Sequence, residues 1–345
     1  MTRRLALIGA DVSIVAVLLL SVGAVAIAAP PVGDPPSPPV PPVASSAVER
    51  GRPDIYFVWR DGSRLAAGQN PYEAILAGNM RENRKYPTYL PLFYVLVAGA
   101  YRLGVTEYGD WMRLWRPLVL ASHLGIAILL FVACWRAGRP VLGAFAALFW
   151  GLNRWTLYVV GVAHVDFPPI LCLLGSLLLF ETRRRVSLLL LGLSLALKQI
   201  AVFVTPLYLV WTWRETREPD ARLPETTRAA GWIALVPGLV SLPFLAWNAE
   251  AFVRSVLFSA TRNPDSHVSA LSFVATLGLA GLSSRLPMLL LMGLVLVAAA
   301  HREIGRYLAV LLLLATFVDF NSVFYLQYMA WLVPFLVLAA VDRRA

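Results

Sequence analysis

Charged residues are scarce in this chain. Asp, Glu, Lys and Arg together make up 14% of its 345 residues, whereas 59% are hydrophobic and mean hydropathy is +0.68. An ordinary soluble domain carries about 25% charged residues. The composition therefore excludes a soluble globular protein and predicts an all-α, polytopic membrane protein with about ten transmembrane helices.

Cysteine and the common catalytic motifs are also nearly absent. The two cysteines, Cys134 and Cys172, lie in separate apolar segments, which argues against a disulfide or a metal site. The sequence contains no zinc-ligand spacing, no nucleotide-binding glycine loop and no Ser-His-Asp pattern. We therefore expect no cofactor and no soluble nucleotide donor.

The net charge of +10 comes almost entirely from arginine, because only Lys85 and Lys198 are lysines. The arginines lie in short loops between apolar runs. Such loops are typical of the cytoplasmic side of a membrane protein, so membrane orientation explains the charge better than nucleic-acid binding.

Three regions follow from the apolar runs. Residues 1–29 are a first transmembrane helix, read as a retained signal anchor, although Ala26-Ile27-Ala28 resembles a cleavage site. Residues 30–116 form an outer loop that starts with a proline-rich spacer and ends with an apolar run, 90–101, too short to span. Residues 117–345 form the transmembrane bundle, with a second outer loop at 248–285. The predicted spans or paired short helices are 117–135, 141–160, 167–180, 186–213, 229–247, 286–300, 307–320 and 325–341. Counting loop charges places both chain ends inside.

The stretch from Asp54 to Glu73 is a polar island within this pattern. Ile55, Val58 and Trp59 begin an apolar stripe at helical spacing, which predicts an amphipathic helix on the membrane surface. Gly68 stands where a C-terminal cap belongs. Asn70-Pro71 with Glu73 predicts the start of a second short helix.

Three carboxylates on the expected outer side each have two interpretations. Asp54 is either the N-cap of the first surface helix or a catalytic carboxylate. Asp61 either forms a surface ion pair with Arg64 at i,i+3 or lines a binding site. Asp166, which precedes Phe167-Pro168-Pro169, either caps the next helix or faces the site as a second carboxylate.

Further polar residues near the outer side are candidates for substrate binding. Lys198 lies inside an apolar run, where an ionisable group is usually functional, and either holds a lipid phosphate or snorkels to the interface. Arg262 and His267 lie in a polar, turn-rich segment, and Arg262 would suit a bidentate phosphate contact or a plain loop. Asn321 and Gln327 flank the start of the last span. Aromatic belts account for Tyr325, Tyr328 and Trp331 without a binding role.

Several of these motifs together resemble the polytopic lipid-linked-sugar glycosyltransferases of the GT-C fold. The resemblance extends to the eukaryotic first GPI mannosyltransferase and to bacterial polyprenol-phosphate-mannose-dependent mannosyltransferases. It is carried by Asp54 with the Gly-x-x-Pro-Tyr that ends at Tyr72, by Lys198 after an Ala-rich helix, and by two later motifs. These are Thr261-Arg262 followed by His267, and Phe320-Asn321-x-Val323-x-x-x-Gln327-Tyr328-x-x-Trp331.

The resemblance implies a multi-pass mannosyltransferase of the cell membrane with its active site on the outer face. It also implies a polyprenyl- or dolichyl-phosphate sugar donor, a lipid or glycan acceptor, and Asp54 as the catalytic carboxylate. The family often has Asp-x-Asp here, but Arg52 replaces the first Asp, which argues against a divalent metal. The alternatives are a lipid or sugar transporter or flippase, and a non-catalytic subunit of a glycosylation complex.

Overall fold

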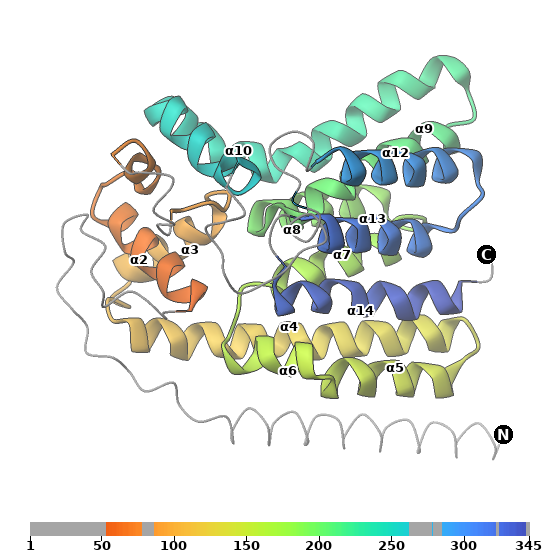
Figure 1. Cartoon of the computed structure of the whole chain (residues 1–345), viewed down its shortest axis with the longest axis horizontal. Helices are drawn as coiled ribbons and strands as arrows, with labels where there is room; N and C mark the ends of the chain where they lie inside the picture. The colour runs from red at the N-terminus through yellow and green to blue at the C-terminus, as the bar shows by residue number, and fades with distance from the viewer. Residues whose placement is uncertain (1–52, 78–85, 262–277, 279–284, 322–323, 343–345) are drawn as a thin grey trace.

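The computed structural model describes residues 53–77, 86–261, 278, 285–321 and 324–342 of the chain, and these residues form an all-helical structure without strands (Figure 1). The α-helices are α2 (Asp54–Ala66), α3 (Leu92–Arg102), α4 (Tyr108–Arg136), α5 (Pro140–Leu152), α6 (Arg154–Gly161), α7 (Phe167–Leu179), α8 (Arg184–Leu197), α9 (Thr205–Glu215), α10 (Pro219–Thr261), α12 (Leu286–His301), α13 (Arg306–Phe320) and α14 (Leu326–Val341). Two short 3₁₀ helices, η2 (Pro71–Ile75) and η4 (Gln199–Phe203), join them. The all-α prediction is confirmed.

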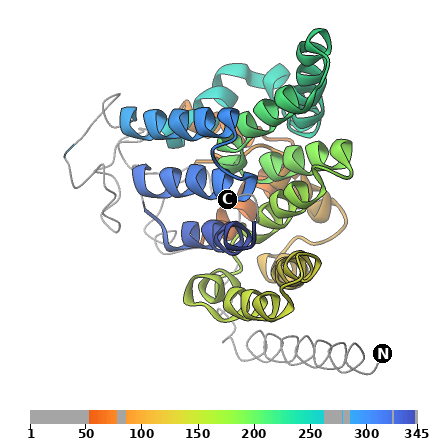
Figure 2. The same cartoon turned by 90° about the vertical axis from the view of Figure 1, so that its right-hand side faces the viewer.

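The helices form a bundle with a distinct cap at one end. Helices α12, α13 and α14 lie side by side, and α4 and α5 pack along the edge of the bundle beside α14 (Figures 1 and 2). Helices α2 and α3 pair with each other at the left end of Figure 1, away from the C-terminus. The predicted polar island therefore sits at one end of the bundle.

The first helix of the polar island is present at the predicted place. In α2, Ile55 and Val58 are buried, and the chain leaves the helix through Gly68 at φ +78°, a left-handed conformation that favours glycine. The amide of Gly68 donates to the carbonyl of Leu65. This is the C-terminal cap expected from the sequence.

The second short helix is a 3₁₀ turn. Asn70 accepts a hydrogen bond from the amide of Tyr72 at 3.1 Å, and Pro71 takes the first helical position. Glu73 accepts a bond from Asn248 Nδ2 at 3.3 Å, across the chain. η2 is thereby attached to α10 where Asn248 breaks its helical conformation.

Two described helices are long and apolar enough to cross a membrane, Tyr108–Arg136 and Pro219–Leu257. At a rise of about 1.5 Å per residue, the first is about 43 Å long. It begins at Tyr108, so it crosses the predicted boundary at residue 116. The short run 90–101 contains the 11-residue helix α3, which is too short to span a bilayer core of about 30 Å.

Two predicted segments differ in the structure, and one predicted break is confirmed. The single span 141–160 is two helices, because Asn153 ends α5 and its side chain caps α6 by accepting from the amides of Trp155 and Thr156. The segment 186–213 is broken at Lys198, as expected from its polar interruption. Helix α10 continues to Thr261, so the predicted outer loop 248–285 begins with helix. The predicted first helix 1–29 and the spacer 30–43 lie outside the described residues.

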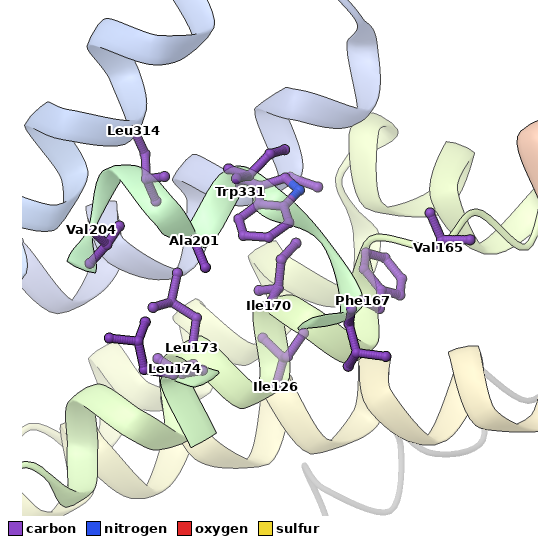
Figure 3. Close-up of a cluster of buried hydrophobic side chains, with 14 of the residues drawn as sticks. Ile126, Val165, Phe167, Ile170, Leu173, Leu174, Ala201, Val204, Leu314 and Trp331 are labelled. Atoms are coloured by element: carbon purple, nitrogen blue, oxygen red, sulfur yellow. The ribbon is translucent and has the colours of Figure 1, made fainter. Parts of the chain in front are cut away.

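A buried apolar cluster fills the middle of the bundle. Helix α7 contributes Phe167, Ile170, Leu173 and Leu174, and Trp331 of α14 lies against them (Figure 3). The indole nitrogen of Trp331 donates to Asp166 at the polar end of the bundle. Trp331 therefore links the apolar cluster directly to the candidate site.

Candidate functional site

Four ionisable side chains of alternating charge form a chain at the capped end of the bundle. Asp54 Oδ2 lies 3.0 Å from His164 Nε2, and His164 Nδ1 contacts Asp166 Oδ2. Asp166 Oδ1 then accepts from Lys198 Nζ at 2.5 Å. The series joins α2, the segment before α7, and the break between α8 and η4. We call these four residues the charge chain.

Asp54 is the most accessible member of the charge chain. Its side chain is 32% exposed, whereas that of Asp166 is fully buried. Asp54 is the first residue of α2 and Pro53 is the N-cap, with no side-chain capping bond. The N-cap position thus falls on Pro53, one residue before the predicted one, and the helix N-terminus favours the negative charge of Asp54.

His164 is presented by a strained turn. Ala163, just before it, has φ +49°, which costs a non-glycine residue roughly 1–3 kcal/mol. Trp115 Nε1 donates to the carbonyl of Ala163 at 2.8 Å, and the amide of His164 donates to Val159 at 3.0 Å. Strain of this kind persists only where surrounding contacts fix it, and here those contacts aim the imidazole at Asp54.

Lys198 is placed by the end of α8. Its backbone is extended, with φ −154° and ψ 129°, so the helix stops there and η4 starts afresh. Ser194 Oγ holds α8 to the start of α7 by donating to the carbonyl of Pro169 at 2.7 Å. The Lys198 ammonium lies 5.8 Å from the ring centroids of Tyr89 and Tyr328. Its buried charge pairs with Asp166, so snorkelling to the interface does not describe it.

Asp166 is the centre of the charge chain. Its carboxylate receives Lys198 Nζ, His164 Nδ1 and, at 2.6 Å, Trp331 Nε1. Burial raises the pKa of this carboxyl, but Lys198 and His164 outweigh burial and hold the pKa well below its usual range. Asp166 occupies the N-cap position of α7 without making a capping bond. Its carboxylate is instead directed to Lys198, His164 and Trp331.

His164 lies between two carboxylates. Burial lowers its pKa, but the charge of Asp166 and the hydrogen bonds to Asp166 and Asp54 raise the pKa above the ordinary value of about 6.5. Lys198 opposes them weakly. These contacts therefore favour the imidazolium form more than in a free histidine, with one ring nitrogen facing each carboxylate.

Asp61 lies two turns along α2 from Asp54. Its carboxylate is 3.0 Å from Arg60 Nη2 and 3.5 Å from Arg64 Nη1. The predicted pair with Arg64 is confirmed, but it is not a surface pair, because the Asp61 side chain is almost fully buried. Asp61 therefore stabilises α2 through ion pairs with two arginines of the same helix.

The remaining predicted residues fall in two places. Gln327 is buried in the first turn of α14, next to Tyr328, and Asn321 ends α13. Tyr328, the residue after Gln327, has its ring centroid 5.8 Å from Lys198 Nζ, so the start of α14 lies near the Lys198 end of the charge chain. Arg262 and His267 lie outside the described residues.

Sequence reasoning missed two members of the site. His164 was passed over although it stands two residues before Asp166 in a polar segment at the mouth of an apolar run. Trp331 was assigned to an aromatic belt, but it donates to a buried carboxylate. The available signal for His164 was its position two residues before Asp166. For Trp331 it was a side chain with an N–H donor, four residues after Gln327.

Within the described ranges, no group of three or more His, Cys, Asp or Glu side chains has an arrangement that could hold a metal ion. No protein-family model, curated protein or solved structure matches this chain. The functional argument therefore depends on the residues and their geometry.

Proposed function

We propose that this chain is a membrane glycosyltransferase that moves a sugar from a polyprenyl-phosphate donor to an acceptor hydroxyl. The observation that carries the proposal is the charge chain, a buried series of paired charges that ends in one accessible carboxylate, Asp54. Mannose as the sugar comes from the GT-C resemblance.

The helical bundle supports a membrane setting. Besides the two long apolar helices, α12 exposes Leu289, Leu290 and Leu294, each more than half accessible, and α10 exposes Leu239 and Leu242 in the same way. Large apolar surfaces of this kind mark contact with lipid or with another protein. We propose a multi-pass topology in which the charge chain faces the outer compartment.

Asp54 suits the role of general base. An acceptor hydroxyl gives its proton to a carboxylate as its oxygen attacks the anomeric carbon. The bond from that carbon to the phosphate oxygen breaks, and the electron pair leaves with the polyprenyl phosphate. Because the phosphate itself is the leaving group, no acid is needed to protonate it at neutral pH. A single accessible carboxylate beside fixed positive charge is sufficient for this step.

The direct experiment is transfer of radiolabelled sugar from polyprenyl-phosphate mannose by the purified full-length protein in lipid nanodiscs. Extracted cell-envelope lipids and glycans serve as acceptors. We expect a labelled product that forms in proportion to protein. Transport of the unreacted donor across sealed vesicles without transfer would indicate a flippase instead. Absence of both, with binding to another glycosyltransferase, would indicate a non-catalytic subunit.

A further inference from the structure

We propose that His164 is a positioning residue that remains an imidazolium throughout sugar transfer, so that the charge chain becomes positive when the phosphate leaves. The proposal rests on the proposed function, and it assigns a role to a residue that has no substrate contact. It follows from the geometry of His164 between two carboxylates, from its burial, and from the strained turn that aims it.

The net charge of the charge chain is the sum over its four residues. With His164 protonated, Asp54 and Asp166 carry two negative charges, and His164 and Lys198 carry two positive charges. The sum is zero. A neutral series can be buried without the large penalty of an unpaired charge.

The net charge of the charge chain changes during the reaction. When Asp54 takes the proton of the acceptor, the charge chain changes from zero to +1. In the same step the phosphate changes from a diester with one negative charge to a monoester with two. The total charge of the site and substrates is unchanged. Positive charge therefore develops on the protein as negative charge develops on the leaving group.

His164 keeps its own proton because each of its ring nitrogens faces a carboxylate. Its Nδ1 faces Asp166, whose charge is held by Lys198 and by the indole of Trp331. Its Nε2 faces Asp54 at 3.0 Å. Asp166 stays ionised after Asp54 is neutralised, so the imidazolium keeps one carboxylate partner. Trp115 and the left-handed Ala163 fix the backbone next to His164, so its imidazole stays in the site.

The titratable groups around His164 come from several elements. They are Asp54 from α2, Tyr89 before α3, Asp166 before α7, Lys198 after α8 and Tyr328 from α14. Burial raises the pKa of the Tyr89 phenol, and Lys198 is paired with Asp166. The two ionisations that govern the pH dependence are therefore those of Asp54 and His164.

These assignments predict the shape of the pH profile. Transfer needs Asp54 ionised and His164 protonated, so kcat/KM of the parent is bell-shaped. In His164→Gln the alkaline limb disappears. The acid limb moves to higher pH, because Asp54 loses a neighbouring cation that favoured its ionised form. At the parent's optimum we expect kcat to fall about 10- to 100-fold, with KM for the donor nearly unchanged.

His301→Gln is the matched control, since His301 is an exposed histidine at the end of α12. It should keep the parental profile. A parental, bell-shaped profile in His164→Gln would overturn the inference while leaving the proposed function intact. A parent with no transfer activity would instead remove the proposed function.

A measurement without activity keeps the inference testable in every case. The raised pKa of His164 means that its contribution to stability is fully present below the unfolded pKa of about 6.5 and is lost as pH rises through the folded pKa. Nitrogen-15 NMR of the four histidines in the folded parent should find one that is still an imidazolium at pH 7.5. It should persist in His301→Gln. If all four titrate at or below pH 6.5, the inference is wrong, whether or not His164→Gln folds.

Discussion

Replacing Asp54 with Asn separates a catalytic role from a structural one. Asn has the same shape and keeps an oxygen for His164 Nε2, which lies 3.0 Å from Asp54 Oδ2. It cannot accept a proton from a sugar acceptor. Asn also removes the negative charge from the first turn of α2, where it favours the helix.

The two roles differ in size. A first-turn carboxylate stabilises a helix by about 0.3–1 kcal/mol. A shift of this size moves the melting temperature by only a few degrees. A positioned general base contributes about 100- to 10,000-fold in rate, or about 3–5 kcal/mol of barrier. The rate effect is therefore several times larger than the stability effect.

The matched control is Asp110→Asn. Asp110 is also a first-turn carboxylate, at the start of α4, and its exposed side chain pairs with Arg113 at 2.6 Å. Asp54→Asn should lose somewhat more stability than Asp110→Asn, because Asp54 also pairs with buried His164, which keeps Asp166 as its other carboxylate partner. Only Asp54→Asn should lose transfer.

The assay compares initial rates of sugar transfer at saturating donor and acceptor, together with thermal unfolding of the same preparations. We expect Asp54→Asn to unfold within a few degrees of the parent and to retain less than about 1% of its activity. If Asp54→Asn keeps more than about a tenth of the parental rate, Asp54 is not the base. The search would then move to a residue outside the charge chain, because Asp166 is fully buried.

Three further predictions address topology, metal and packing. With Cys134 and Cys172 replaced, a cysteine at exposed Gln69 should react with an impermeant thiol reagent in intact cells, and a cysteine at exposed Arg217 should not; the opposite pattern would refute the outer placement of the charge chain. Chelation by EDTA should leave transfer within about twofold of the untreated rate, since Lys198 and His164 supply positive charge; restoration of a lost rate by Mg²⁺ or Mn²⁺ would contradict this. Gly192→Ala should lower the unfolding free energy by about 1–3 kcal/mol, because its Cβ would lie 2.4 Å from the carbonyl oxygen of Ile233 where α8 crosses α10. The control Gly175→Ala, whose Cβ would lie 3.5 Å from Leu190, should cause no loss. Equal melting temperatures of the two variants would show that the crossing adapts.

Local features of the fold were predictable because their causes lie within a few residues. The apolar stripe of α2, the left-handed turn at Gly68 and the break at Lys198 each follow from side-chain spacing or backbone preference. The break at Asn153 was missed because apolar runs continue on both sides of Asn153-Arg154, and hydropathy alone does not register one capping side chain. The predicted end of the span at Trp247 coincides with a break in α10 at Asn248, but the chain continues beyond it as helix to Thr261 instead of entering a loop.

The candidate site was predictable only in part. Asp54, Asp166 and Lys198 were identified singly, each from its unusual position in an apolar sequence. Their mutual contacts were not, because Asp54 and His164 are 110 residues apart and meet only through the packing of the bundle. The charge of a residue does not reveal its partner. The sequence therefore suggested phosphate for Lys198, where the structure places a carboxylate.

The buried part of the charge chain is poorly explained as a source of stability. Burying a carboxylate and an ammonium requires each to lose its hydration, and an apolar pair of similar volume is often equally stable or more so. Asp166 and Lys198 are buried, and Asp166 contacts Trp331 of the apolar core, where an apolar pair would pack well. What an apolar pair would not do is hold His164 as a cation against Asp54. A strained turn at Ala163, a tryptophan that fixes it and a buried ion pair all act on one imidazole, and that imidazole contacts the one accessible carboxylate of the series. The shared orientation of these separately unfavourable features is what makes Asp54 the best candidate for the site of chemistry.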